Sequence, residues 1–494
     1  MDSDRRQLHI FFFPHMVPGH TLPLVDTAKL FARRGVRATI LTTPANAISV
    51  AASISRASEA GYPVETLLVE IPPAEAGVPE NLADTNSADA QMNLLLSTAR
   101  LRGPFELLLR EHRPDAVVSD MFLPWSGEVA EELGVPRLVF HVTSFFSLCL
   151  FDTLFHHPPP ESSDGEEGEL YAVPGLPHRI QLDRSQIPDF RQHTPQFAEL
   201  FAKAKQAEKK CFGVVVNSFY ELEPEYADHY RKAVGMKAWH VGPVSLCNDH
   251  HGDRSARGGA GVDPDKCLSW LASKDPRSVT YVCFGSLCLF TAAQLREIAL
   301  GLEASGHPFV WVVRDLAGKG GPSSEPWLPE GFEERTVGTG MVIRGWAPQL
   351  LLLNHEAVGG FVTHCGWNSC VEGITAGLPM VAWPMFADQF YNERLLVQVL
   401  GVGVSMGGAM RYTLREEERP LVGAEEVARA VKVLMGGGGG EMRLRARELK
   451  EAARAAMGEG GSSYGDMGFL IEELLGKQTT PETSRERREM MGKQ

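Results

Sequence analysis

Short apolar runs recur along the first half of the chain, separated by longer stretches with helical spacing. The runs lie at residues 10–13, 36–43, 64–71, 115–120, 137–143 and 213–218, and residues 23–34 form one of the helical stretches. Runs that are largely continuous, without regular polar alternation, are typical of strands buried on both faces. The first half is therefore predicted to form a parallel sheet with helices on both sides.

A second set of apolar runs lies at residues 279–285, 308–313, 340–346, 359–364 and 379–384. Between the two sets, residues 247–262 are polar, Gly-rich and without periodicity, which is typical of a linker. We therefore expect two doubly wound α/β domains, one over residues 1–246 and one over residues 263–458. Ligands of such folds bind outside the carboxyl ends of the strands, so the site is expected in a cleft between the domains.

One more helical pattern lies near the C-terminus, over residues 459–476. Its apolar residues follow the i, i+3, i+4 spacing of an amphipathic helix: Met467, Leu470, Ile471, Leu474 and Leu475. Ser463 and Asp466 have the spacing of a capping box at the start of this helix. The polar residues 477–494 are predicted to form a mobile tail.

Length and composition agree with this plan. A chain of 494 residues exceeds what one hydrophobic core normally serves, and 44% apolar with 22% charged residues is typical of a soluble globular protein. The formal net charge of −14 argues against nucleic acid or an anionic membrane surface as a partner. It also means that a phosphate must be bound by local donors, because the overall field repels it.

The cysteines and the N-terminus favour the cytosol. The eight cysteines include no CxxC pair, so reduced and buried thiols are expected. The apolar run at residues 8–14 is too short for a signal peptide or a membrane span, and the chain has no Asn-x-Ser/Thr sequon. We expect a cytoplasmic protein, without stable membrane insertion, that is a monomer.

Two side chains of the first domain suggest a general base with an orienting carboxylate. His20 lies between the first apolar run and a helical stretch whose first turn Pro23 marks, so its ring is expected near a helix N-terminus, which disfavours the imidazolium. Asp120 ends the run at residues 115–120. A base held by a carboxylate is the arrangement of a catalytic triad, with a substrate hydroxyl in place of the serine. Either residue alone is more often structural, and His15 is a rival base.

Residues 346–389 carry groups that suit a nucleotide sugar. Trp346 follows a strand at a turn, and its indole face can stack on a base whose edge Gln349 can reach. Asp388 and Gln389 lie side by side and can bind several sugar hydroxyls with both donors and acceptors. The structural alternatives are a core tryptophan that caps the sheet and an ordinary polar loop.

The turn from His364 to Ser369 runs from a strand end into a helix start. Backbone N–H groups at a helix N-terminus, together with the side chains of His364, Asn368 and Ser369, form an anion site, and Ser286 adds a donor from the neighbouring strand end. A pyrophosphate could be bound in this way although residues 346–389 include no lysine, and the same donors would stabilise a departing diphosphate without a metal. Ser369-x-x-Glu372 also has the spacing of a capping box, so Glu372 has a structural alternative to ligand binding.

Residues 346–389 resemble, almost position by position, the signature box of plant UDP-dependent glycosyltransferases of specialised metabolism. The segments LHIFFFP, VPGLPHRIQL, NSFYELEPEY and WLPEGFEERT look like the same family, so the resemblance covers nearly the whole chain. It implies the GT-B fold, in which two Rossmann-like domains face each other across a cleft. It also implies that the helix at residues 459–476 crosses back onto the first domain.

The resemblance assigns a role to each candidate residue. The catalytic His and Asp of the family fall on His20 and Asp120, and the residue that binds the ribose hydroxyls falls on Glu372. In the family, Gln at position 389 goes with glucose donors and His with galactose donors. The donor-binding residues are expected to be Ser286, Trp346, Ala347, Gln349, His364, Gly366, Trp367, Asn368, Ser369, Glu372, Asp388 and Gln389. The acceptor pocket is expected to include His15, Phe122 and Phe145.

These assignments predict an inverting O-glucosyltransferase that uses UDP-glucose as co-substrate and needs neither a metal nor another cofactor. Its acceptor is expected to be a small lipophilic molecule (a flavonoid, another phenolic, a terpenoid or a hormone), converted to a β-glucoside through an oxocarbenium-like transition state. The alternatives are the same fold with UDP-galactose, UDP-xylose or UDP-glucuronate, and a catalytically silent UDP-sugar sensor. An NAD-dependent oxidoreductase is disfavoured because Gly401-Val402-Gly403 opens no helix.

Overall fold

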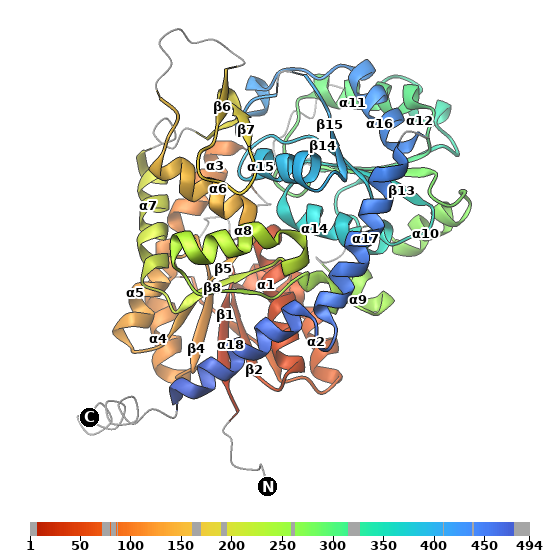
Figure 1. The fold of residues 1–494 in the computed structure, drawn as a ribbon. Coiled ribbons are helices and arrows are strands. Elements are labelled where there is room, and N and C mark those ends of the chain that lie inside the picture. The colour runs from red at the N-terminus through yellow and green to blue at the C-terminus, as the bar shows by residue number, and fades with distance from the viewer. Residues whose placement is uncertain are drawn as a thin grey trace, which may run out of the picture.

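The computed structural model describes residues 7–71, 80, 85, 87–160, 169–188, 195–257, 262–314, 327–408, 410–436 and 439–478. Each half of the chain forms an α/β domain around its own sheet (Figure 1). The predicted mobile tail lies, from residue 479 onward, outside the described residues.

The N-terminal domain contains a seven-stranded, entirely parallel sheet with the order β3-β2-β1-β4-β5-β8-β9. Its strands are β1 (His9–Phe13), β2 (Arg37–Thr42), β3 (Val64–Leu68), β4 (Ala116–Asp120), β5 (Arg137–His141), β8 (Gly213–Val216) and β9 (Ala238–His240). The first six coincide with the predicted apolar runs. The edge strand β9, which has three residues, was not predicted.

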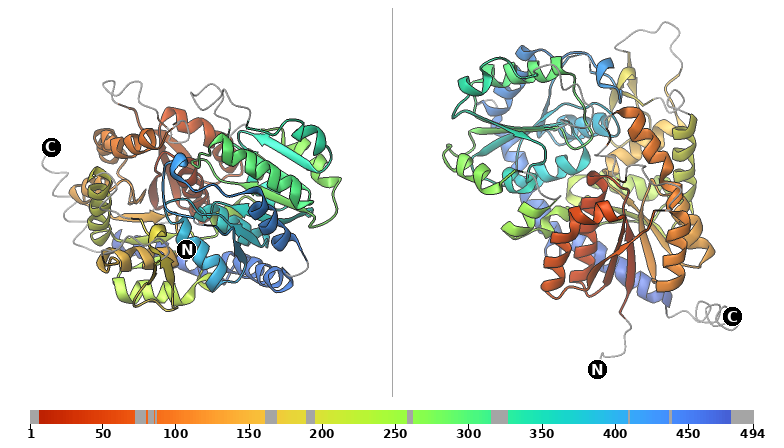
Figure 2. Two further views of the ribbon diagram at one scale, coloured as in Figure 1. Left: turned by 90° about the horizontal axis from the view of Figure 1, so that it is seen from above. Right: turned by 180° about the vertical axis from the view of Figure 1, so that it is seen from behind.

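Helices cover both faces of this sheet (Figure 2). Phe12 packs into a core with residues of α1, α2 and α18, whereas Phe11 and Phe13 face α4 and α5 on the opposite side. A strand with apolar neighbours on both faces has no position for a polar residue, which explains the continuous run in the sequence. The helices of this domain are α1 (Pro18–Arg33), α2 (Pro44–Glu59), α3 (Ala88–Leu96), α4 (Arg102–His112), α5 (Trp125–Glu132), α6 (Phe145–His156), α7 (Pro195–Lys209) and α8 (Pro224–His229), with a small hairpin of β6 (Leu170–Ala172) and β7 (Gln181–Asp183).

The C-terminal domain repeats this plan with a six-stranded parallel sheet, ordered β12-β11-β10-β13-β14-β15. This is the 3-2-1-4-5-6 order of a Rossmann fold. The strands are β10 (Val279–Cys283), β11 (Phe309–Val313), β12 (Gly340–Arg344), β13 (Val358–Thr363), β14 (Met380–Ala382) and β15 (Gly403–Ser405). The helices are α10 (Pro264–Ala272), α11 (Ala292–Ser305), α12 (Phe332–Arg335), α13 (Gln349–Leu353), α14 (Trp367–Ala376), α15 (Gln389–Arg394) and α16 (Ala424–Met435). The predicted fold class is confirmed.

Helix α1 begins earlier than the sequence predicted. Pro18, and not Pro23, lies in its first turn, where a missing backbone N–H costs nothing because that group has no helical partner. Pro23 lies inside the helix and cannot donate to the carbonyl of Gly19, four residues before it. His20 is thereby in the first turn of α1.

The two last helices, α17 (Gly440–Met457) and α18 (Ser462–Gln478), return the chain to the N-terminal domain. Met467, Leu470 and Leu474 of α18 join the core beside β9 and α1, as the resemblance implied. The predicted capping box is wrong, because α18 begins at Ser462 and the side chains of Ser463 and Asp466 bind the N-terminal domain. The Ser463 hydroxyl donates to the Gly242 carbonyl at 2.6 Å, and Asp466 accepts from the backbone and ring of His240.

Part of the segment predicted as a linker is helical. It contains the short helix α9 (His251–Ala256), and Cys247 is 1% exposed. Arg257 directly follows α9 and has a largely buried side chain. Among the helices that the structure describes, none is long and apolar enough to span a membrane.

Candidate active site

The carboxyl ends of both sheets meet where the two domains touch. From the N-terminal domain come the first turn of α1, the end of β4 and Thr143 after β5; from the C-terminal domain come the N-termini of α14 and α15. Several hydrogen bonds join the two sides. Among them, Asn368 Nδ2 donates to the Gly19 carbonyl, Trp367 Nε1 to the Asn217 carbonyl, and Thr143 Oγ1 to Asp388. His20, Trp367, Asn368 and Asp388 therefore lie within one interdomain region.

His20 and Asp120 form a pair. His20 Nδ1 lies 2.6 Å from Asp120 Oδ2, and the other oxygen of this carboxylate accepts the backbone N–H of Phe122 at 2.9 Å. The Asp120 side chain is fully buried, whereas that of His20 is 19% exposed. Burial alone would raise the pKa of Asp120, but the His20 ring and the Phe122 N–H lower it below its ordinary value. The carboxylate is thus ionised at neutral pH and fixes the ring through Nδ1.

Two further rings surround this pair. The rings of His15, His20 and Phe122 lie 5.6 to 5.8 Å apart, centre to centre. His15 is 1% exposed, and among the residues that the structure describes its two ring nitrogens have no hydrogen-bond partner. Burial and the neighbouring His20 lower the pKa of His15 to about 3. His15 is therefore a neutral ring without the carboxylate that His20 has, which makes it a poor base.

Phe145, the third residue predicted for the acceptor pocket, lies in the hydrophobic core. Its ring is 0% exposed and packs on Tyr230 and His240, at 5.5 and 4.7 Å between ring centres. It opens α6, and its backbone N–H donates to the buried carboxylate of Glu223. The contacts of Phe145 are thus core contacts, and its place in the acceptor pocket stays a prediction.

His364 is fixed between two glycines. A Cβ atom added to Gly285 or to Gly366 would collide with its ring, which explains why glycine occupies both turns. The next residue, Cys365, has a positive φ of 63°, and this sharp turn leads directly into α14. Half-buried Ser286 follows Gly285. Burial lowers the pKa of His364 to about 4, so a neutral imidazole lies at the end of α14 whose first N–H groups have no helical partner.

Trp367 and Asn368 contact the N-terminal domain. Asn368 Nδ2 donates to the carbonyl of Gly19, the group that Pro23 leaves without a helical donor. Trp367 Nε1 donates to Asn217 at 2.8 Å. Because Pro23 leaves the Gly19 carbonyl free, this carbonyl can accept from Asn368. The C-terminal domain thereby contacts the residue that precedes His20.

Glu372 does not cap α14, so the capping-box alternative is wrong. The helix begins at Trp367 with Gly366 as its N-cap, which places both Ser369 and Glu372 inside it. The two oxygens of Glu372 accept from Arg257 Nη1 and Gln349 Nε2, each at 2.7 Å. Half-buried Trp346 and buried Ala347 precede Gln349, and Trp346 Nε1 donates to the backbone of Arg257 at 3.4 Å.

Asp388 and Gln389 lie at the start of α15 with different surroundings. Asp388 accepts from Thr143 Oγ1 at 2.5 Å, and burial raises its pKa. Gln389 is 3% exposed, and its side-chain oxygen accepts the backbone N–H groups of Met385 and Phe386. The amide oxygen of Gln389 is therefore used to shape the loop, and its NH₂ group is the part that could bind a sugar.

Sequence reasoning missed the residues that join the domains: Thr143, Asn217, Arg257 and Asn392. Asn392 is fully buried; its Nδ2 donates to the Cys365 carbonyl and its Oδ1 accepts from Ser147 of α6. Each partner is remote in sequence, so no local spacing marks the pairs. Among the residues that the structure describes, no group of three or more His, Cys, Asp or Glu is arranged to hold a metal ion.

Comparisons with known proteins agree with this architecture. The family model described as UDP-glucoronosyl and UDP-glucosyl transferase matches residues 258–412. Scopoletin glucosyltransferase of Nicotiana tabacum is 45% identical over 475 residues, which are 95% of this chain and 98% of that protein.

Solved structures of plant proteins share the fold over nearly the full length, and two of them carry bound ligands that bear on the site. UGT73P12 of Glycyrrhiza uralensis, complexed with glycyrrhetinic acid 3-O-monoglucuronide, has a TM-score of 0.88 at 38% identity, covering 99% of this chain and 100% of its own. UGT71G1 of Medicago truncatula, complexed with UDP-glucose, has a TM-score of 0.78 at 26% identity, covering 96% and 100%.

The chain has two Rossmann-like domains that meet at the carboxyl ends of their sheets. Together with the similarity to these solved structures, this arrangement defines a GT-B protein. The chain belongs to the plant UDP-glycosyltransferase family, as the resemblance of residues 346–389 implied.

Proposed function

We propose that this enzyme is an inverting, UDP-glucose-dependent O-glucosyltransferase that converts a small lipophilic acceptor, foremost a phenolic, to a β-glucoside. The observation that carries the proposal is the His20–Asp120 pair, held against the N-terminus of α14 through the contact of Asn368 with Gly19. This arrangement brings a base with an orienting carboxylate next to a helix N-terminus suited to a diphosphate.

In the proposed reaction His20 Nε2 takes the proton of the acceptor hydroxyl, and the ionised Asp120 stabilises the imidazolium through Nδ1. The acceptor oxygen attacks the anomeric carbon opposite to the bond that breaks, and UDP leaves with the electron pair of that bond. An α-linked donor therefore gives a β-glucoside. The N–H groups of α14, with His364 and Ser286, would hold the charge that develops on the departing diphosphate.

The donor residues are proposed from the same geometry. Trp346, Ala347 and Gln349 would contact the uracil, Glu372 the ribose, and Asp388 with Gln389 the glucose. Gly366, Trp367, Asn368 and Ser369 would form the diphosphate site at α14. His15 and Phe122, whose rings adjoin His20, would line the acceptor pocket.

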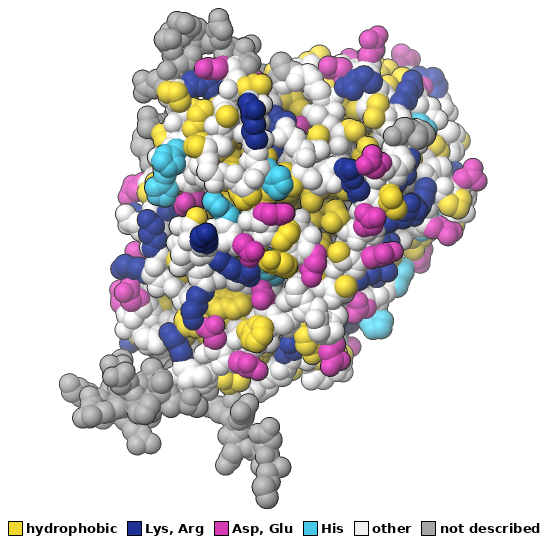
Figure 3. Space-filling view, viewed as in Figure 1, with side chains coloured by type: hydrophobic (Ala, Val, Ile, Leu, Met, Phe, Trp, Pro, Cys, Tyr) yellow, Lys and Arg dark blue, Asp and Glu magenta, His cyan; other side chains and the backbone are white. Residues whose placement is uncertain are grey.

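The cellular location, the partners and the oligomeric state are proposed from the cysteines, the charge and the core. All eight cysteines are free, which favours the reducing cytoplasm. Basic side chains are interspersed with acidic ones on the face shown in Figure 3, and together with the net charge of −14 this disfavours nucleic acid as a partner. A monomer is proposed because the largest buried core, which extends over residues of both domains, is completed within one chain.

A direct test incubates the full chain with UDP-glucose and a panel of coumarins, flavonoids and terpenoid alcohols, read by mass spectrometry. We expect a product heavier than a phenolic acceptor by one hexose, with stoichiometric release of UDP. UDP-galactose, UDP-xylose and UDP-glucuronate serve as competing donors. Nucleotide binding without transfer to any acceptor would favour the sensor, and a preference for another donor would overturn the glucose assignment.

The role of Gln389 can be tested without disturbing its loop. In Gln389→Glu an oxygen still accepts the N–H groups of Met385 and Phe386, while the NH₂ donor is lost. We expect kcat/KM for UDP-glucose to fall roughly tenfold, as for one hydrogen bond at a reacting substrate, with unchanged competitive inhibition by UDP. If UDP inhibition weakens to the same degree, Gln389 acts on the loop and not on the sugar.

The proposed stabilisation of the leaving group predicts independence from divalent metals. The donors at the N-terminus of α14 can take the place that Mg²⁺ has in sites where carboxylates hold it against phosphates. We expect the full rate in excess EDTA, and impaired UDP binding and turnover in His364→Ala. Activity that disappears with the chelator and returns with Mg²⁺ or Mn²⁺ would contradict this part of the mechanism.

A further inference from the structure

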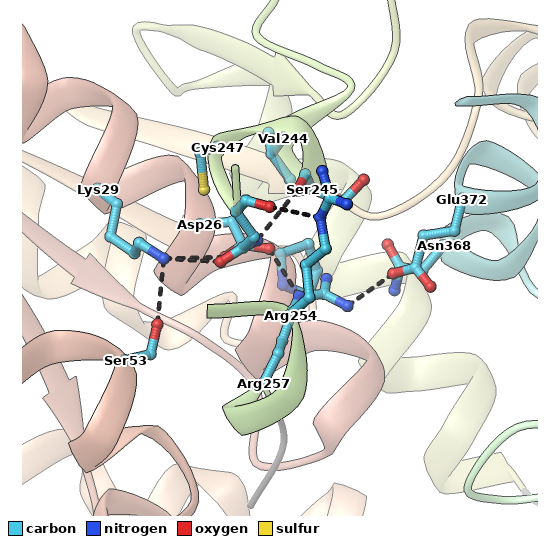
Figure 4. A network of polar contacts seen from close by, with 12 residues as sticks. Asp26, Lys29, Ser53, Val244, Ser245, Cys247, Arg254, Arg257, Asn368 and Glu372 are labelled. Carbon is cyan, nitrogen blue, oxygen red and sulfur yellow. Dashed lines mark hydrogen bonds and ion pairs between the residues drawn. The ribbon is translucent and has the colours of Figure 1, made fainter. Parts of the chain in front are cut away.

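A buried guanidinium joins the two domains at the proposed ribose carboxylate (Figure 4). Arg257 Nε donates to Asp26 Oδ2 of α1 at 2.8 Å, and its Nη1 donates to Glu372 Oε1 of α14 at 2.7 Å. The side chains of Arg257, Asp26 and Glu372 are only 10%, 2% and 4% exposed. One cation from the interdomain segment thus binds one carboxylate of each domain.

The Asp26 end of this network is firmly anchored. Asp26 Oδ1 accepts from Asn248 Nδ2 at 3.0 Å, and Lys29 lies 3.9 Å from the same oxygen while donating to Asn248. Two cations and two carboxylates therefore balance in a buried cluster. Burial alone would lower the pKa of Arg257, but the two carboxylates raise it above its ordinary value.

The two contacts of Glu372 differ in how easily they can be exchanged. Breaking a buried ion pair leaves an uncompensated charge, which is strongly unfavourable. The contact of Oε2 with the neutral amide of half-buried Gln349 can be exchanged for a hydroxyl at little cost, because one hydrogen bond replaces another. A carboxylate oxygen also has two lone pairs, so Oε1 can keep Arg257 while Oε2 turns to a ligand.

We propose that Arg257 is a positioning residue of the nucleoside subsite, which fixes Glu372 so that its free lone pairs meet the ribose hydroxyls. The inference rests on the proposed role of Glu372 in ribose binding. It extends the donor site beyond Ser286 and residues 346–389 to the interdomain segment and, through Asp26, to α1 of the N-terminal domain.

The test compares the binding of UDP and of 2′-deoxy-UDP by calorimetry, with no acceptor present. A hydrogen bond to a charged group predicts that wild type binds UDP about tenfold or more tightly than the deoxy nucleotide. In Arg257→Met this ratio should fall toward one, because Glu372 is no longer held. Arg257→Lys, which cannot bridge both carboxylates with a planar fork, should give an intermediate ratio.

The ratio of the affinities for UDP and 2′-deoxy-UDP is measured on the same variant. A general loss of stability lowers both affinities alike and therefore does not change the ratio. Arg56→Met is the matched control: Arg56 also ties the interdomain segment to the N-terminal domain, through Asp253 at 2.7 Å, and should leave the ratio unchanged. Glu372→Gln should lower the ratio by itself, and Arg257→Met added to it should lower it no further.

Each other outcome overturns the inference. A ratio that stays at the wild-type value in Arg257→Met would make Arg257 a general structural residue, and a ratio that rises would mean that Arg257 competes with the ribose. In both cases the proposed function stands. A wild-type ratio near one would remove the assignment of Glu372 as well, and absence of sugar transfer in the acceptor panel would reject the proposed function independently.

Discussion

Replacement of His20 by alanine is expected to remove most of the turnover while leaving UDP binding nearly unchanged. The ring of His20 is held by a buried carboxylate, with Nδ1 at 2.6 Å from Asp120, and is itself partly exposed. Loss of a general base typically lowers the rate about 10²–10⁴-fold. The measurement is the initial rate with saturating UDP-glucose and a phenolic acceptor, beside calorimetry of UDP.

His15→Phe is the matched control for this substitution. His15 is a second histidine whose ring centre lies 5.6 Å from that of His20. Its ring nitrogens have no hydrogen-bond partner within the described part of the chain, and its pKa is lowered to about 3. Phenylalanine retains the flat ring, so kcat should change by no more than a few-fold. A His20→Ala enzyme with near-normal kcat, or an inactive His15→Phe enzyme, would reverse the two assignments.

Most strands of the two sheets could be predicted because a strand that is buried on both faces appears in the sequence as a continuous apolar run. Phe11, Phe12 and Phe13 face two different cores in alternation, so no polar residue interrupts the run. The edge strands β9 and β15 have three residues each, too few for periodicity to distinguish them from loops. The predicted start of α1 was wrong because two prolines, Pro18 and Pro23, could each occupy the first turn. Pro23 can lie inside the helix because Asn368 donates to the Gly19 carbonyl in place of the missing N–H, and Asn368 is 349 positions from Gly19.

The residues of the candidate site that lie in short local sequence patterns could be predicted. His20, Asp120 and His364 each lie at the end of a strand or the start of a helix, where the sequence itself marks the edge of the sheet. The contacts between the domains have no such marker: Arg257 and Glu372 are 115 positions apart, and Thr143 and Asp388 are 245 apart. In the sequence, Arg257 is a single arginine in a Gly-rich segment and looks like a solvent-exposed linker residue. Its burial follows from contacts with both domains, which only the three-dimensional structure shows.

Replacement of Asp120 by asparagine is the second change with a large expected effect. Asparagine can still accept the Phe122 N–H, but it has no charge to stabilise the imidazolium that forms at His20. Its amide can also present NH₂ to Nδ1, which would favour the wrong tautomer. We expect kcat to fall about 10²-fold or more, with little change in UDP affinity because Asp120 touches neither α14 nor Glu372 among the contacts found.

The control for this variant is Asp115→Asn, at the other end of the same strand. Asp115 precedes β4 and is 5% exposed, and its carboxylate accepts the His9 backbone N–H at 2.9 Å. It shares burial and strand with Asp120 but is remote from His20, so asparagine there should affect the melting temperature more than kcat. If the two variants lose activity in proportion to their loss of stability, Asp120 serves the fold of β4, and the proton transfer must be assigned to another group. A large fall in kcat confined to Asp120→Asn, with Tm and UDP affinity retained, is what an orienting carboxylate requires.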